Sequence, residues 1–153
     1  MLKRLLVLTG AALLLMPAGA LASVRRDDEA SLLRAINIAR ADHGLAPVRI
    51  GPRLERAARA HTESMLATQA FTHGPFVERL RSFHVTAPMI AENLAWATGT
   101  DTTAQSIVRA WLASPPHRRN LLEPSFTVVG IGELAGDFQG LANARVVTVD
   151  FAG

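Results

Sequence analysis

The chain has 153 residues, no cysteine, and a net charge of +3 from 16 basic and 13 acidic side chains. This length suits a single domain, and without cysteine no disulfide bond forms, so the fold must depend on a packed core and hydrogen bonds. The charges are balanced, and no basic stripe carries interleaved aromatic residues, which argues against a protein that binds DNA or RNA.

The first 22 residues have the organisation of a signal peptide. Lys3 and Arg4 precede an apolar run over residues 5–16, and small residues then lead to Ala20-Leu21-Ala22, which is typical of a cleavage site. An uncleaved membrane anchor is the less favoured alternative, because the apolar run is shorter than the ~20 residues that a spanning helix needs.

The mature chain is therefore expected to be one domain over residues 23–153, secreted or periplasmic. Loss of Lys3 and Arg4 leaves 14 arginines against 13 acidic residues, a net charge of +1. No segment after the signal peptide is long and apolar enough to be expected to span a membrane.

Two amphipathic helices are predicted at the start of this domain. Apolar residues recur at helical spacing over residues 28–44, and the closing glycine stops the first helix. Pro52 suits the first turn of a second helix, which reaches about Gln69 and carries His61 on its apolar stripe. Between them, residues 45–50 form a connector or a brief strand.

Residues 70–98 are less periodic. Residues 71–75 are expected to form a loop, residues 76–82 a short helix, and residues 84–89 a second connector. Such loops, held by rigid elements, are where functional side chains often lie.

A third long helix and another short helix follow. A residue at 100–102 is expected to cap the long helix, whose apolar stripe ends at Trp111. Ser114 and Pro115 then have the pattern of an N-cap and first helical residue, and they begin a short helix through Leu122.

The sequence closes with two predicted strands, residues 128–134 and 144–151, joined by a turn at 136–140 as an antiparallel hairpin. Gly130 and Gly132 inside the first strand indicate a bulge or close backbone packing. Helices followed by strands predict an α+β fold, with the helices packed on a small antiparallel sheet.

Three residues stand out as candidates for chemistry. His73 lies in a loop, His117 near the start of a short helix, and Glu92 in an otherwise apolar run where a carboxylate needs a partner. One interpretation is a hydrogen-bonded network that ties loops together. The other is a His-Glu-His metal site with one open position, as in catalytic zinc sites. Spacing alone favours the network.

The other polar candidates have structural explanations. His61 is expected to be a hydrogen-bonded core residue, and His43 is placed at a helix C-terminus, where a cation is favourable. Ser114 is interpreted as an N-cap rather than a nucleophile, since the sequence contains no Gly-x-Ser-x-Gly pattern.

The ordered series of motifs resembles the bacterial branch of the CAP superfamily, also called the SCP domain. The matching residues extend over the whole mature chain: Ile36-Asn37-x-x-Arg40, His43-Gly44-Leu45 with Pro47, Leu54-x-x-Ala57-Ala58-x-x-His61-x-x-x-Met65, Phe71-x-His73, Ala91-Glu92-Asn93-Leu94-Ala95, Ala110-Trp111-x-x-Ser114-Pro115-x-His117-Arg118, Asn120-Leu121-Leu122, Phe126-x-x-Val129-Gly130-Ile131-Gly132 and Asp150-Phe151.

The resemblance implies a three-layer α-β-α sandwich with a central cleft. Animal members have two His and two Glu there. His73, Glu92 and His117 match three of these positions, and Ser114 stands where the second Glu would be. The expected ligand cleft is thus His73, Glu92, Ser114 and His117.

The leading hypothesis is a secreted, non-enzymatic binding module, whose cleft binds a divalent metal such as zinc, or a small or lipid ligand. His73, His117 and Glu92 are its candidate metal ligands. One alternative is a metal-dependent, peptidase-like hydrolase with Glu92 as ligand or general base. The other is a cell-envelope interaction protein with a purely structural cluster.

Overall fold

The structure is a computed structural model that describes residues 18–153, with side chains from Asp27 onward. The apolar run of the predicted signal peptide, residues 5–16, lies outside the described residues. The first helix, α1 (Ala18–Ala41), begins ten residues before the predicted start, so the backbone around the expected cleavage site is helical. In the described part of the chain, no helix combines the length and apolarity needed to cross a membrane.

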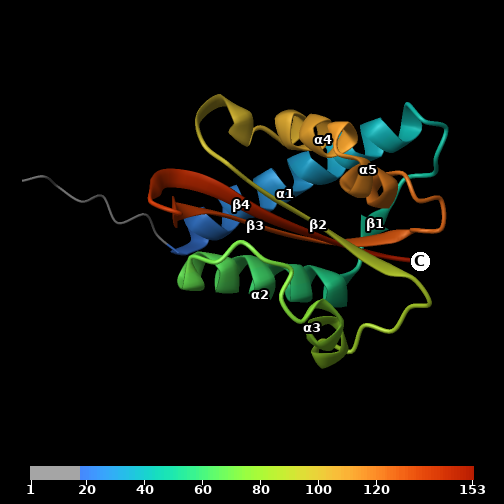
Figure 1. The fold of residues 1–153 in the computed structure, drawn as a ribbon, viewed down its shortest axis with the longest axis horizontal. Helices are drawn as coiled ribbons and strands as arrows, with labels where there is room; N and C mark the ends of the chain where they lie inside the picture. The colour runs from blue at the N-terminus through green and yellow to red at the C-terminus, as the bar shows by residue number, and fades with distance from the viewer. Residues whose placement is uncertain (1–17) are drawn as a thin grey trace, which may run out of the picture.

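Helical layers cover both faces of one sheet, with α1, α4 and α5 on one side and α2 and α3 on the other (Figure 1). This arrangement confirms the predicted three-layer α-β-α sandwich. The remaining elements are β1 (Arg49–Ile50), α2 (Pro52–Thr68), α3 (Phe76–Ser82), β2 (Ile90–Ala97), the 3-10 turn η1 (Gly99–Thr102), α4 (Ala104–Ala113), α5 (Pro115–Leu121), β3 (Val128–Phe138) and β4 (Leu141–Ala152).

The sheet has the strand order β1-β3-β4-β2. The hairpin of β3 and β4 is antiparallel as predicted, and β2 pairs antiparallel with β4 in a register that places Glu92 opposite Asp150. The two-residue strand β1 pairs parallel with β3, so the sheet is mixed rather than wholly antiparallel. Strand β2 was not expected, because its sequence shows no alternation of apolar and polar residues.

Helix α2 packs directly on the backbone of β3. A Cβ atom on Gly130 would lie 2.1 Å from the carbonyl carbon of Leu54, and one on Gly132 would lie 2.4 Å from the carbonyl oxygen of Ala58. Any larger residue at either glycine would force the helix off the sheet. Of the two explanations offered for this glycine pair, close packing is the correct one.

A buried arginine joins segments that are far apart in the sequence. Arg40 in α1 has no solvent exposure, and its guanidinium donates hydrogen bonds of 2.9–3.1 Å to four main-chain carbonyls. The acceptors are Ala46, Leu121, Glu123 and Phe126. One side chain thus connects α1 to the connector before β1, the end of α5 and the segment that enters β3.

Side chains of α4 and α5 bind the outer edge of β2, the strand at one end of the sheet. The indole Nε1 of Trp111 donates to the carbonyl of Leu94 at 3.0 Å, and the amide of Asn120 donates to the carbonyl of Glu92 at 3.1 Å. The predicted cap of α4 lies one residue later than expected, at Thr103, whose hydroxyl accepts from the Ser106 amide.

Glu133 is an acidic residue inside the domain. It is 4% exposed, forms an ion pair with Arg145, and its Oε2 atom has no hydrogen-bond partner among the described residues. Burial raises the pKa of Glu133 to about 7, although Arg145 opposes the shift. The folded chain therefore holds a proton here at pH values where an unfolded chain has released it.

We expect the free energy of unfolding to decrease by on the order of 3 kcal/mol as the pH rises from about 4.5 to about 7, at 1.36 kcal/mol for each unit of pKa difference. The stabilisation is complete below the unfolded pKa and is lost as pH rises through the folded pKa. In urea denaturation at several pH values, the free energy of unfolding of Glu133→Gln should not show this decrease with pH. The exposed-site variant Glu78→Gln should show the same decrease as wild type. Equal slopes in wild type and Glu133→Gln would contradict the assignment.

Candidate functional site

Glu92 lies at the centre of the candidate site. It projects from β2 with its side chain 2% exposed. One carboxylate oxygen, Oε1, is 2.6 Å from Nδ1 of His73, while Oε2 forms an ion pair with Arg79 and is 3.8 Å from Nε2 of His61. The sequence predicted that this acid needs a partner, and the structure supplies three.

Arg79 of α3 also binds a second buried carboxyl, Asp150, at 2.9 Å. Because β2 and β4 place Asp150 opposite Glu92, one guanidinium serves two neighbouring acids. Burial raises the pKa of Asp150 well above its ordinary value; Arg79 opposes this shift and Glu92 adds to it. Sequence reasoning identified neither Arg79 nor Asp150 as site residues. Knowledge of the β2–β4 register would have revealed them, since two adjacent buried acids require a cation.

His73 connects this buried charge network to solvent. Its side chain is 58% exposed, although Nδ1 is held against Glu92. An ionised carboxylate only accepts hydrogen bonds, so Nδ1 of His73 must be the donor. In the neutral ring, Nε2 then carries the free lone pair, and Nε2 has no hydrogen-bond partner among the described residues.

His117 in α5 has a similar arrangement, with Nδ1 2.9 Å from the hydroxyl of Ser114. Ser114 occupies the predicted N-cap position, but its side chain makes no capping bond to the helix. Asn93 holds the segment by donating to the carbonyl of His117 at 3.0 Å. Burial lowers the pKa of His117, and the charge of nearby His73 lowers it further, so the two rings share one electrostatic environment.

His61 supports the loop that carries His73. It is 8% exposed, and its Nε2 atom is 2.9 Å from the main-chain carbonyl of Thr72. Burial lowers the pKa of His61, with Arg79 contributing in the same direction. The prediction of a hydrogen-bonded core histidine is confirmed. His43 makes the expected helix-end contact, with Nδ1 2.7 Å from the Ala39 carbonyl.

The chemistry of these donors bears on metal binding. Across residues 27–153, no group of three or more His, Cys, Asp or Glu side chains is arranged to hold a metal ion. Both oxygens of Glu92 are engaged, one by His73 and one by Arg79. The ring nitrogens Nε2 of His73 and His117 are the atoms of the cluster that these hydrogen bonds leave free, and Glu92 orients the first of the two rings.

Comparison with known proteins identifies the family. Residues 33–140 match the CAP family, described as the cysteine-rich secretory protein family. The Bacillus subtilis protein YkwD is 32% identical over 110 residues, covering 68% of this chain and 41% of YkwD. The human Golgi-associated plant pathogenesis-related protein 1 is 30% identical over 96 residues, covering 63% of this chain and 56% of the human protein. The chain thus spans less than two thirds of either relative.

Solved structures agree on the fold. An extracellular SCP-domain protein from Bacillus anthracis has a TM-score of 0.74 at 22% identity, covering 90% of this chain and 44% of that one. An outer surface protein from Borrelia burgdorferi has a TM-score of 0.70 at 22% identity, covering 82% of this chain and 92% of that one. Although it has no cysteine, the chain belongs to the CAP family of cysteine-rich secretory proteins.

Proposed function

We propose that this CAP domain is an exported, non-enzymatic binding module that takes a divalent metal ion such as zinc through the Nε2 atoms of His73 and His117. The observation that carries the proposal is the 2.6 Å hydrogen bond from Nδ1 of His73 to Glu92. A carboxylate on one ring nitrogen fixes the tautomer and directs the other nitrogen toward a metal, as is common for histidine ligands. In the tautomer in which Nδ1 of His117 donates to the hydroxyl of Ser114, Nε2 of His117 is free in the same way.

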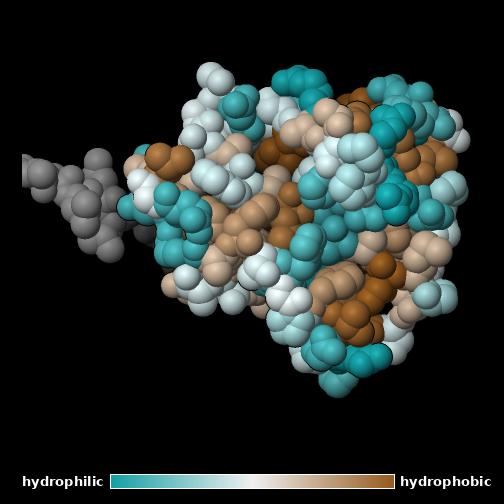
Figure 2. Space-filling model, viewed as in Figure 1, coloured by the Kyte–Doolittle hydropathy of each residue, from teal (hydrophilic) through white to brown (hydrophobic). Residues whose placement is uncertain are grey.

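Two protein ligands leave coordination positions for water or for donor atoms of a small ligand. The surroundings offer apolar contacts to such a ligand. Phe71, two residues before His73, is 44% exposed, and two further exposed apolar residues lie in the segments that carry Arg79 and Glu92: Val77 at 38% and Met89 at 45%. Figure 2 shows apolar surface gathered over α3 and the segment that leads to β2. These surfaces favour a small or lipid ligand with an apolar part.

The hydrolase alternative has less support from the geometry. A general base needs an oxygen that is free to accept a proton, but both oxygens of Glu92 are engaged, one by His73 and one by Arg79. Glu92 is better placed to orient His73 than to activate a water. For export, the support is the signal-peptide pattern of residues 1–22 together with structural neighbours described as extracellular and outer surface proteins.

Isothermal titration with zinc tests the metal site. We expect stoichiometric binding by the wild-type protein and its loss in His73→Ala and in His117→Ala. Glu92→Gln should keep the stoichiometry but weaken the affinity by about 10- to 100-fold, the usual effect of removing an orienting partner. Affinity should also decrease as the pH is lowered, because the imidazoles must be neutral to bind metal.

His84→Ala is the matched control, since His84 is an exposed histidine outside the cluster and should titrate like wild type. Equal heats in wild type and His73→Ala, or no heat in either, would overturn the metal site. If the histidine variants only lowered thermal stability, the cluster would be structural, as the cell-envelope interaction hypothesis predicts.

A further inference from the structure

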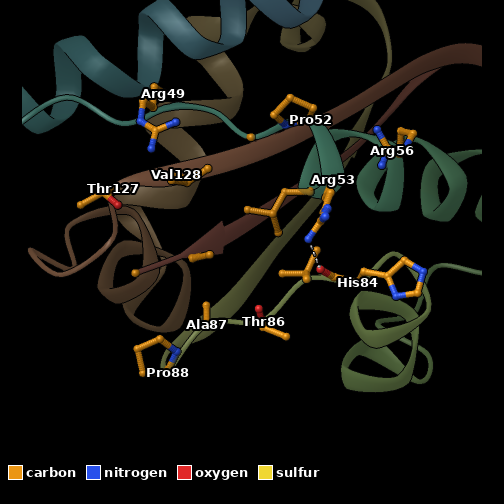
Figure 3. A pocket seen from close by; sticks show the side chains of 15 residues that line it. Arg49, Pro52, Arg53, Arg56, His84, Thr86, Ala87, Pro88, Thr127 and Val128 are labelled. Carbon is orange, nitrogen blue, oxygen red and sulfur yellow. Dashed lines mark hydrogen bonds between the residues drawn. The ribbon is translucent and has the colours of Figure 1, made fainter.

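A cavity lies away from the histidine cluster. Its volume is about 610 Å³, and it is formed by the start of α2, the connector 84–88, the start of β3 and the end of β4 (Figure 3). None of its lining residues belongs to the cluster around Glu92. The volume is in the range of small-molecule sites, which span roughly 300–1,000 Å³.

Three arginines, Arg49, Arg53 and Arg56, line this cavity, and no acidic residue does. Within the described residues none of the three forms an ion pair, whereas Arg59 and Arg79 do. Arg53 reaches toward the connector and donates to the main-chain carbonyl of His84 at 3.0 Å, as the dashed line in Figure 3 shows. Positive charge is thus concentrated in one hollow of a chain whose charges are otherwise nearly balanced.

The first turn of α2 adds to this positive potential. Its N-cap, Gly51, supplies no capping side chain, and a Cβ atom there would lie 2.4 Å from Cγ1 of Val128. The close contact with β3 therefore excludes the Ser, Thr, Asp or Asn that usually caps a helix. The amide groups of Arg53 and Leu54 lie at the positive end of a 17-residue helix whose N-cap has no side chain, and the one acid of its first turn, Glu55, forms an ion pair with Arg59.

The rest of the lining is mostly apolar. The residues that contribute it are Leu54, Val85, Ala87, Pro88, Val128 and Ala152. An inorganic ion would use the arginines and leave this surface exposed, whereas a ligand with an anionic group and an apolar part would contact both.

We propose that this cavity binds a small organic anion. Its carboxylate or phosphate-ester group lies in the positive potential of Arg49, Arg53, Arg56 and the first turn of α2, and its apolar part packs on Leu54 and Val128. Guanidinium groups form paired hydrogen bonds with both kinds of oxyanion, so the two head groups share one recognition chemistry. The site is separate from the proposed metal site, and neither depends on the other.

Titration of the ¹⁵N-labelled protein with phenyl phosphate and, separately, with phenylacetate tests the proposal by amide chemical shifts. We expect at least one of them to cause saturable shifts at Gly51, Leu54, Ala87 and Val128, and the one that binds identifies the head group. Affinity should decrease with added salt, because the interaction is ionic. Benzyl alcohol, which lacks the anion, and inorganic phosphate, which lacks the apolar part, should bind at least tenfold more weakly.

Arg49→Gln/Arg56→Gln should weaken binding by at least tenfold, and both arginines are exposed, so the variant should remain folded. Arg81→Gln/Arg119→Gln removes the same charge from exposed sites elsewhere and should bind like wild type. His73→Ala should also bind normally. The proposal would be overturned by equal affinity in Arg49→Gln/Arg56→Gln, by benzyl alcohol binding as tightly as the anions, or by shifts that map to another surface.

Discussion

Arg40→Met is expected to lower the free energy of unfolding by about 4 kcal/mol or more, which is among the larger losses that a single substitution causes. Methionine retains most of the apolar volume but donates no hydrogen bond, so four main-chain carbonyls lose this donor, and of these the Glu123 carbonyl keeps the Phe126 amide at 3.3 Å. Each buried acceptor without a partner costs about 1–3 kcal/mol, and the sum is reduced by local relaxation. Urea denaturation followed by circular dichroism measures the loss.

Arg34→Met is the matched control, because Arg34 lies in the same helix but is exposed. Its effect should stay within about 0.5 kcal/mol. Arg40→Lys should recover only part of the stability, since an ammonium group presents its donors at one point rather than along a planar fork. A loss below about 1 kcal/mol in Arg40→Met would mean that other donors satisfy these carbonyls.

Arg79→Met is expected to destabilise the domain by about 3–5 kcal/mol at pH 7, the usual cost of removing one partner of a buried ion pair. Glu92 is 2% exposed at its side chain and Asp150 is fully buried, so neither carboxylate gains solvent in compensation. Removing the cation removes the group that opposes the raised pKa of Asp150, so this pKa rises further in the folded state. The loss should therefore be smaller at pH 5 than at pH 7, because protonation becomes easier in the folded state.

Two further variants separate this effect from lost packing. Arg81→Met, on the exposed side of the same helix, should have little effect at either pH. Arg79→Met/Asp150→Asn should be more stable than Arg79→Met, because it removes one of the two buried carboxyl groups that are left without the cation. If the Arg79→Met loss were equal at pH 5 and pH 7, the contribution of Arg79 would be packing rather than charge compensation.

The elements with a clear period were predictable from the sequence. Helix α2 begins at Pro52 and the hairpin of β3 and β4 forms as expected, since apolar spacing and turn residues act locally. Strand β2 was missed because it carries Glu92 and Asn93 in place of a regular alternation. Their burial is tolerated only through partners from α2, the loop 71–75, α3 and α5, which no local pattern reveals.

Local sequence patterns likewise revealed only part of the site. Family resemblance indicated His73, Glu92, Ser114 and His117 in advance, because each lies in a short motif. The predicted role of Ser114 as an N-cap is only partly correct. Ser114 occupies the N-cap position, but its hydroxyl contacts His117 instead of the helix amides. Arg79 could not be recognised in its own segment, where Arg81 follows two residues later and only the fold distinguishes the buried arginine from the exposed one.

The bonds from Trp111 and Asn120 to β2 have a consequence for self-association. An end strand with free carbonyls is a template on which another chain can add a strand, and stacking of this kind leads to aggregates. Here the carbonyls of Glu92 and Leu94 already accept side-chain donors from α4 and α5. The middle of β2 is therefore closed to the addition of a strand from another chain. This protects the domain from aggregation at that edge, which matters because no disulfide bond stabilises the fold.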